Sequence, residues 1–163
     1  MLKSAIKKIM NTQSEHNLCP IYVGTSFKNK GVQPVMDAIV DYLPSPNLRD
    51  PVHDAEDKEQ IRKPVKTDPL AGYVFKILYD LEMGPLAYTR IYSGEMKKTT
   101  NLLNSSTNTP EKIGHIYRVR ANQYVPVNHI FTGDIVAISG LRDTKAGQTL
   151  IEYGSRKFCL DPL

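Results

Sequence analysis

Residues 70–94 read LAGYVFKILYDLEMGPLAYTRIYSG, and they are the clearest indication of the fold class. Residues 73–79 alternate with the two-residue period of an extended strand, whose successive side chains point to opposite faces of a sheet. Gly84-Pro85 then interrupts the pattern, and a second run of apolar and aromatic residues follows from Leu86 to Tyr92. Two such runs joined by a turn predict a β-hairpin.

Similar short runs continue toward the C-terminus, with turn residues between them. We expect strands at Thr100–Asn104, Gly114–Arg120, Asp134–Ser139 and Thr149–Glu152. Short strands at a spacing of roughly ten residues indicate a closed antiparallel barrel, which leaves no strand edge exposed. The predicted fold class is therefore mainly β, with this barrel over residues 70–163.

The part of the chain before this barrel has a different pattern. Residues 2–10 and 32–43 place apolar side chains at helical spacing, and Ile21-Tyr22-Val23 is a short β-branched and aromatic run. Residues 1–46 are therefore expected to form a helix, a strand and a second helix. Residues 47–69 are rich in charge, and their apolar residues are too scattered to build a core, so they predict a charged linker with room for a short helix around Asp54 to Arg62.

Composition excludes several classes of protein. Cys19 and Cys159 lie far apart without CxxC spacing, and the four histidines form no metal-ligand series with them, so neither a disulfide framework nor a zinc site is expected. Reduced thiols fit a cytosolic or organelle-matrix location. No apolar run approaches the ~20 residues of a membrane-spanning helix, so no membrane partner is expected. The net charge of +4 is spread along the chain, which is typical of a solvated surface.

One loop and the end of the following helix resemble a known family. Gly24-Thr25-Ser26-Phe27-Lys28-Asn29-Lys30-Gly31, followed by Asp41-Tyr42-Leu43-Pro44-Ser45-Pro46, is similar to the end of the GTP-binding domain of elongation factor G. The resemblance implies that residues 1–46 are the C-terminal end of an α/β GTPase domain. It also implies a guanine-binding role, in which Thr25, Ser26 and Phe27 lie against the base and Lys28 lies beside it. In that family the contact runs through backbone N–H groups, which tolerate the Thr and Ser found here.

The motifs that hold the phosphates and the metal in GTPases are absent from the sequence. There is no Gly-Lys-Ser/Thr and no Asp-x-x-Gly, and Val32 stands where an Asn-Lys-x-Asp motif would require aspartate. GTP or GDP with magnesium is therefore expected only in an intact parent protein, of which this chain would be a piece. We expect no GTP hydrolysis, no catalytic residue and no metal site in this chain alone.

The predicted barrel resembles the second domain of the same factors. The resemblance is carried by Gly84–Leu86, Arg90–Gly94, Ala121-Asn122 and the long run Thr132–Leu150, in which Gln148 replaces the usual aspartate. Gly84–Leu86 with Arg90–Gly94, and Ala121–Val125, look closest to the mitochondrial ribosome-releasing type, also called mitochondrial elongation factor G paralogue two. The resemblance implies translocation or ribosome recycling, with the ribosome as a partner. The releasing subfamily further implies a ribosome recycling factor as a second partner and a mitochondrial-matrix location, and any other subfamily implies a cytoplasmic one.

In relatives this domain touches small-subunit ribosomal RNA, and cations on loops and strand ends can contact a phosphate backbone. The candidate residues are Lys97, Lys98, Lys112, Arg118, Arg120, Arg142 and Lys145. Each could equally be a solvated surface charge, since the basic excess is weak. The tyrosines 88, 92, 117 and 124 could stack on bases, or they could form part of the barrel wall.

Two other classes of function compete with this interpretation. The chain could be a free-standing barrel that binds single-stranded RNA, preceded by a helical extension. It could also be a small enzyme, but His115, His129 and Asp134 have no serine or cysteine nucleophile in a recognisable turn beside them.

Overall fold

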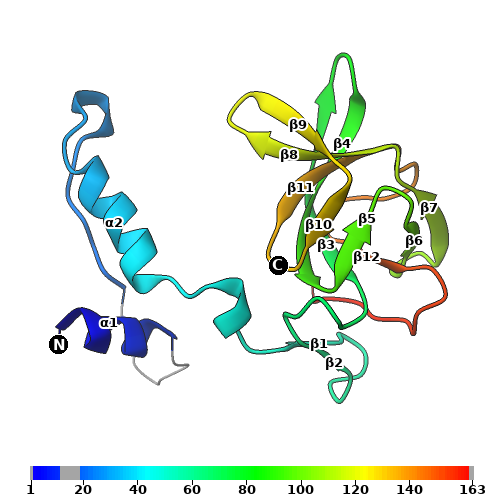
Figure 1. Ribbon diagram of the computed structural model, residues 1–163, viewed down its shortest axis with the longest axis horizontal. Coiled ribbons are helices and arrows are strands. Elements are labelled where there is room, and N and C mark those ends of the chain that lie inside the picture. The colour runs from blue at the N-terminus through cyan, green and yellow to red at the C-terminus, as the bar shows by residue number, and fades with distance from the viewer. Residues whose placement is uncertain (1, 12–18, 162–163) are drawn as a thin grey trace. The chain divides into compact units, whose positions relative to one another are not determined.

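The computed structural model describes residues 2–11 and 19–161, and it divides the chain into two compact units between Leu48 and Arg49. Figure 1 shows the helices in the first unit and the sheet in the second. No helix among the described residues is long and apolar enough to cross a membrane.

The first unit contains the two predicted helices. These are α1 (Leu2–Asn11) and α2 (Val32–Tyr42), with 3₁₀ turns at Ser26–Lys28 and Pro46–Leu48. An ion pair of 2.6 Å between Lys3 Nζ and Asp41 Oδ2 links α1 to α2. No residue of α2 is buried, and Met36, Ile39 and Val40 are 62%, 53% and 79% exposed. The prediction of two helices is therefore confirmed, and the apolar residues of α2 remain largely exposed among the residues that the structure describes.

The prediction of a strand at Ile21–Val23 is wrong. These residues belong to no β-ladder, and Ile21 and Val23 are 86% and 94% exposed. An apolar strand of an α/β domain is buried by neighbouring strands and covering helices. Among the described residues the first unit offers no neighbouring strand, so the sequence pattern alone does not produce one.

The second unit is built on an eight-stranded antiparallel sheet in the order β7-β6-β12-β3-β4-β11-β8-β9. Its strands are β3 (Ala71–Asp80), β4 (Gly84–Ser93), β6 (Asn101–Asn104), β7 (Thr109–Lys112), β8 (His115–Arg120), β9 (Gln123–Val127), β11 (Ile135–Ser139) and β12 (Thr149–Glu152). Two separate ribbons pair β5 (Glu95–Lys97) with β10 (His129–Phe131), and β1 (Val52–His53) with β2 (Ile61–Arg62).

The predicted mainly β, antiparallel fold is confirmed, and each of the six strands predicted within residues 70–163 is present. The strands that were missed are short, and two of them contain proline. Pro110 lies in β7 and Pro126 in β9, which are the two ends of the sheet order. Proline reads as a strand breaker in sequence, but an edge strand tolerates it because one side of the strand needs no N–H donor.

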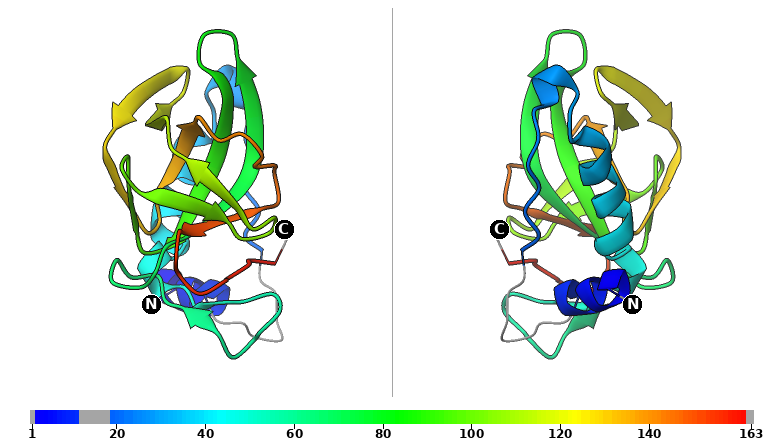
Figure 2. Two further views of the ribbon diagram at one scale, coloured as in Figure 1. Left: turned by 90° about the vertical axis from the view of Figure 1, so that its right-hand side faces the viewer. Right: turned by 90° about the vertical axis from the view of Figure 1, so that its left-hand side faces the viewer.

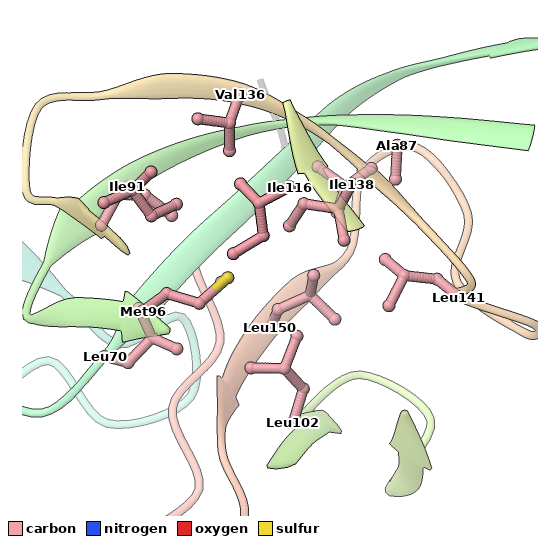
Figure 3. Packing of buried hydrophobic residues seen from close by; sticks show 12 residues of the cluster. Leu70, Ala87, Ile91, Met96, Leu102, Ile116, Val136, Ile138, Leu141 and Leu150 are labelled. Carbon is pink, nitrogen blue, oxygen red and sulfur yellow. The ribbon is translucent and has the colours of Figure 1, made fainter. Parts of the chain in front are cut away.

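The larger of two clusters of buried hydrophobic residues fills the inside of the curved sheet. Figure 3 shows Ile91, Ile116, Ile138 and Leu150 converging from different strands. No ladder joins β7 to β9 among the described residues, and the β5–β10 ribbon completes the enclosure with Met96, which is fully buried, and its pairing partner Ile130. The fold is therefore barrel-like, with a ribbon rather than a continuous ladder covering part of the core.

The β3–β4 hairpin is longer than its neighbours and projects beyond the rest of the sheet, as both views in Figure 2 show. Its turn is fixed by Asp80, whose Oδ1 accepts hydrogen bonds from the N–H groups of Glu82 and Met83 at 2.9 Å each. Tyr79 and Leu81 at the tip are 83% and fully exposed. The register shifts between Val74 and Lys76, which marks a bulge in β3.

The residues predicted as a charged linker, 47–69, lie mostly inside the second unit, and the helix considered at Asp54 to Arg62 is wrong. The segment forms the β1–β2 ribbon and packs against residues 156–161 near the C-terminus. Three ion pairs tie the two segments together: Glu56 with Lys157, Asp57 with Arg156 and Lys58 with Asp161. These charges therefore join two segments that lie about one hundred residues apart in the sequence. We call the β1–β2 ribbon together with residues 156–161 the terminal clasp.

Two buried charged residues lie under these ion pairs. The carboxylate of Asp54, only 5% exposed, accepts hydrogen bonds from the N–H groups of Glu56, Asp57 and Cys159 at 2.8, 3.0 and 2.7 Å. Arg62 is 3% exposed, lies 4.7 Å from the ring centroid of the buried Phe158, and donates to the carbonyl of Arg156 at 3.2 Å. Burial lowers the pKa of Arg62. Burial alone would raise the pKa of Asp54, but the three N–H donors and nearby Lys157 outweigh it and hold that pKa below its usual value.

Asp54→Asn should destabilise the second unit by about 1.5–3 kcal/mol at pH 7, because it removes the charge that three N–H donors share. A carboxyl group with a lowered folded-state pKa stabilises the fold above its unfolded pKa and loses this effect as the pH falls through the folded value. The difference between wild type and variant should therefore shrink below about pH 4. Urea unfolding followed by circular dichroism at pH 7 and pH 3.5 measures this.

Asp50→Asn is the matched control, because Asp50 is exposed. An Asp54→Asn variant as stable at pH 7 as Asp50→Asn would contradict the role given to the Asp54 carboxylate.

Candidate functional site

The loop between Gly24 and Gly31 is closed by its own backbone. The N–H of Thr25 donates to the carbonyl of Lys30 at 2.9 Å, and the N–H of Lys30 donates to the carbonyl of Thr25 at 3.0 Å. Between them Ser26–Lys28 form a 3₁₀ turn, and Asn29 adopts the left-handed conformation with φ 49°. The chain thus reverses direction within a few residues.

Glycine is required on both sides of this loop. Gly31 has φ +77°, and a Cβ there would lie 2.9 Å from both the Cα of Gly24 and the carbonyl oxygen of Val23. A Cβ on Gly24 would lie 2.7 Å from the carbonyl oxygen of Lys30. The close approach of the two backbones therefore leaves no room for a side chain at either position.

The structure brings Thr25, Ser26, Phe27 and Lys28 together in one exposed turn. The N–H groups of Thr25 and Lys28 are used inside the loop. The first N–H groups of a helical turn have no partner within it, which leaves those of Ser26 and Phe27 as the donors of this turn. Phe27 itself is fully exposed. The turn can therefore present two backbone donors and a lysine to an oxygen acceptor.

The seven predicted phosphate-contacting cations come from three separate parts of the second unit. Lys97 and Lys98 lie at the end of β5, Arg118 and Arg120 lie two residues apart on β8, and Lys112, Arg142 and Lys145 come from β7 and the loop between β11 and β12. Two of them are paired with carboxylates: Lys97 with Glu95 at 3.1 Å, and Arg118 with Asp134 at 3.2 Å. The seven candidate cations therefore fall into three groups, and in two of these groups one cation is paired with a carboxylate.

A buried carboxylate binds the backbone of the loop that carries Arg142 and Lys145. Glu111, 3% exposed, accepts hydrogen bonds from the N–H groups of Arg142 and Asp143 at 2.9 Å each and from the hydroxyl of Thr144 at 2.7 Å. Gln148 accepts from the N–H of Lys145 at 2.7 Å. These bonds fix the backbone of the loop and leave its two cationic side chains exposed.

The tyrosines considered for base stacking are engaged with one another or with nearby cations. The hydroxyl groups of Tyr88 and Tyr124 are 3.0 Å apart, Tyr117 packs edge-on against Tyr124, and Tyr92 lies beside Arg90. Burial, together with the hydrogen bond to Tyr124, raises the pKa of Tyr88 to about 12. All four rings are half-buried, and the choice between base stacking and a purely structural role stays a prediction.

The structure gives His115, His129 and Asp134 separate partners. His115 stacks on Tyr117, His129 contacts Glu95 at 3.0 Å, and Asp134 binds Arg118 and accepts from the N–H of Phe131 at 3.0 Å. Within residues 2–11 and 19–161 no group of three His, Cys, Asp or Glu side chains could hold a metal ion.

Sequence reasoning missed the residues that surround Lys97 and Lys98. Thr99, Asn128 and His129 line a surface pocket of about 380 Å³ with these two lysines. The period-two pattern of β5 and β10 would have placed Lys97 and His129 on one face, but both strands are only three residues long and were not recognised.

Comparisons with known proteins agree with this architecture. The family model "Elongation factor G domain 2" matches residues 69–153. A curated relative, elongation factor G of Karelsulcia muelleri (strain GWSS), is 42% identical over 150 residues, which cover 90% of this chain. The chain spans 22% of the length of that relative.

Gly31→Ala should open the loop at residues 24–31, because it combines left-handed strain with a clash against the backbone of residues 23 and 24. We expect the amide protons of Thr25 and Lys30 to lose at least about tenfold in hydrogen-exchange protection, measured by NMR. Gly84→Ala is the control, since Gly84 has φ +72° but no atom within 4 Å of its Cβ position. Unchanged protection in Gly31→Ala would show that the loop does not depend on the close approach.

Proposed function

The chain belongs to the elongation factor G family of translational GTPases, and we propose that it carries the guanine-base loop and the ribosome-contacting β-domain of such a factor. The observation that carries this proposal is the match of the whole curved sheet, residues 69–153, to the family's second domain. The long alignment to the elongation factor from Karelsulcia muelleri supports an extension of the same assignment to the first unit.

In this proposal the second unit docks on small-subunit ribosomal RNA. The cations without a carboxylate partner in the described chain, which include Lys98, Arg120, Arg142 and Lys145, are suited to phosphate contacts. Glu111 holds the backbone of the loop that carries Arg142 and Lys145, so this part of the contact surface does not have to be organised on binding.

The loop at residues 24–31 would contact the guanine base of GTP or GDP in an intact factor. The N–H groups of Ser26 and Phe27 would donate to the exocyclic oxygen that distinguishes guanine from adenine, and Lys28 would lie beside the base. Magnesium and the phosphates would be held by other parts of such a factor.

The finer assignment is to the mitochondrial ribosome-releasing subfamily. The support is the sequence of Gly84–Leu86 and Arg90–Gly94, in β4 and directly after it, and of Ala121–Val125, which spans the β8–β9 turn and the first three residues of β9. This assignment implies a location in the mitochondrial matrix, a role in separating ribosomal subunits and a recycling factor as a partner. A free-standing barrel that binds single-stranded RNA is the alternative, and the experiment below separates the two.

We expect the chain to co-sediment with small ribosomal subunits more strongly than it binds naked single-stranded RNA of similar mass. Raising the salt from 50 to 200 mM should weaken subunit binding by about tenfold or more, because phosphate contacts release counterions. The double variant Arg142→Ala/Lys145→Ala should lower the salt dependence, whereas Lys76→Ala, an exposed cation on β3, should not. Equal or stronger binding to naked RNA would favour the alternative, and binding to neither would contradict both.

The chain should hydrolyse no GTP above the level of a protein-free blank, because the sequence contains no phosphate-binding loop or metal-binding motif. Release of inorganic phosphate from radiolabelled GTP, with and without ribosomes, measures this. Turnover that co-purifies with the chain through two successive columns would refute the assignment of its first unit.

A further inference from the structure

The β5–β10 ribbon has two faces with different roles. Met96 and Ile130 are directly paired and fully buried, so they point into the core. Because side chains alternate along a strand, the flanking residues of both strands must point outward. The outward pairs are Lys97 with His129 and Glu95 with Phe131. Because Met96 and Ile130 cover the core, the aromatic and cationic side chains next to them lie together on the outer surface of the ribbon.

The outer face continues into the pocket lined by Lys97, Lys98, Thr99, Asn128 and His129. Its volume of about 380 Å³ lies within the ~300–1,000 Å³ range of small-molecule sites. Its lining contains no carboxylate, and Lys98 makes no ion pair among the described residues. The backbone around it is fixed, since the N–H of Lys98 donates to the carbonyl of Asn128 at 3.0 Å and the N–H of Lys97 donates to the hydroxyl of Thr100 at 3.0 Å.

The imidazole of His129 is held in place from two sides. Its Nε2 lies 3.0 Å from Oε2 of Glu95, and its centroid lies 4.3 Å from that of Phe131. The side chain is still 36% exposed. The ring of Phe131, tilted by 51° to that of His129, is itself covered by Lys66, whose Nζ lies 3.8 Å from the Phe131 centroid. His129 therefore presents a fixed, partly open ring at the mouth of a cationic pocket.

We propose that this pocket binds one unstacked nucleotide of single-stranded RNA, with the base against His129 and a phosphate at Lys98 and Lys97. A ring beside two lysines matches a nucleotide, because it offers a stacking surface and an anion site within one nucleotide's length. The side chains of Thr99 and Asn128 add hydrogen-bonding groups that can reach a base or ribose edge. A paired base in a duplex cannot enter such a pocket without being extruded.

This inference rests on the RNA contact of the proposed function, which already includes Lys98, and adds His129, Thr99 and Asn128 to it. It also gives Glu95 a role. Its carboxylate orients His129 and Lys97 at 3.0 and 3.1 Å, and the hydrogen bond from Lys97 is the main cause that lowers the pKa of Glu95. Glu95 is therefore a positioning residue beside the pocket and does not line it.

Fluorescence anisotropy with a labelled octamer of uridylate, using the full chain at 100 mM salt, tests the proposal. We expect His129→Ala to weaken octamer binding at least fivefold and His129→Phe, which keeps a ring, to restore most of it. Lys98→Ala should weaken binding severalfold and lower the salt slope by about one, whereas Lys76→Ala should behave as wild type. A duplex of equal length should bind more weakly than the octamer and should not respond to His129→Ala.

The outcomes are distinguishable from those of the proposed function. The inference is overturned if His129→Ala and Lys98→Ala both bind the octamer as tightly as Lys76→Ala does, even when all three variants still co-sediment with small subunits. It is also overturned if uridine monophosphate at 1 mM displaces no octamer while inorganic tripolyphosphate does so fully, since the pocket would then hold only anions. If the octamer responds as expected but no variant binds subunits, the nucleotide site stands and the proposed ribosomal function fails.

Discussion

The structure of the second unit depends on one constraint: a curved antiparallel sheet has an apolar inner face, and that face must be covered where the ladder does not close. The β5–β10 ribbon supplies the cover with Met96 and Ile130. Because a strand alternates its side chains, the same requirement determines what stands outside. The position of His129 beside Lys97 follows from the need to bury the residues next to them.

Charge in this unit serves two different purposes, and burial separates them. In the terminal clasp, Asp54 and Arg62 are buried and their hydrogen bonds join segments from the two ends of the unit. On the sheet and its loops, by contrast, Arg120, Arg142 and Lys145 stay in solvent. Net charge alone does not distinguish these roles, so the weak basic excess of the chain says little about how much cationic surface is available.

The sequence was sufficient for the parts of the fold that are set by local periodicity. Six of the eight strands of the main sheet and both helices follow from alternation and helical spacing. The strand at Ile21–Val23 was wrong because a strand also needs partners, which the period of its own residues does not report. The terminal clasp was missed for a related reason: residues 54–62 read as a polar linker until the segment around Phe158 is brought against them. For the candidate site, the loop at residues 24–31 was found by motif, but which of its N–H groups are free depends on the Thr25–Lys30 pairing.

Pro110 and Pro126 have a consequence for the behaviour of the protein in solution. They lie in β7 and β9, where the ladder of the main sheet ends. A strand edge with a regular row of N–H and carbonyl groups is a template on which another chain can add a strand, and repeated addition leads to cross-β aggregates. A proline interrupts the row of donors at each edge. The two prolines that kept β7 and β9 from being recognised in the sequence thus protect an unclosed sheet from polymerising edge to edge.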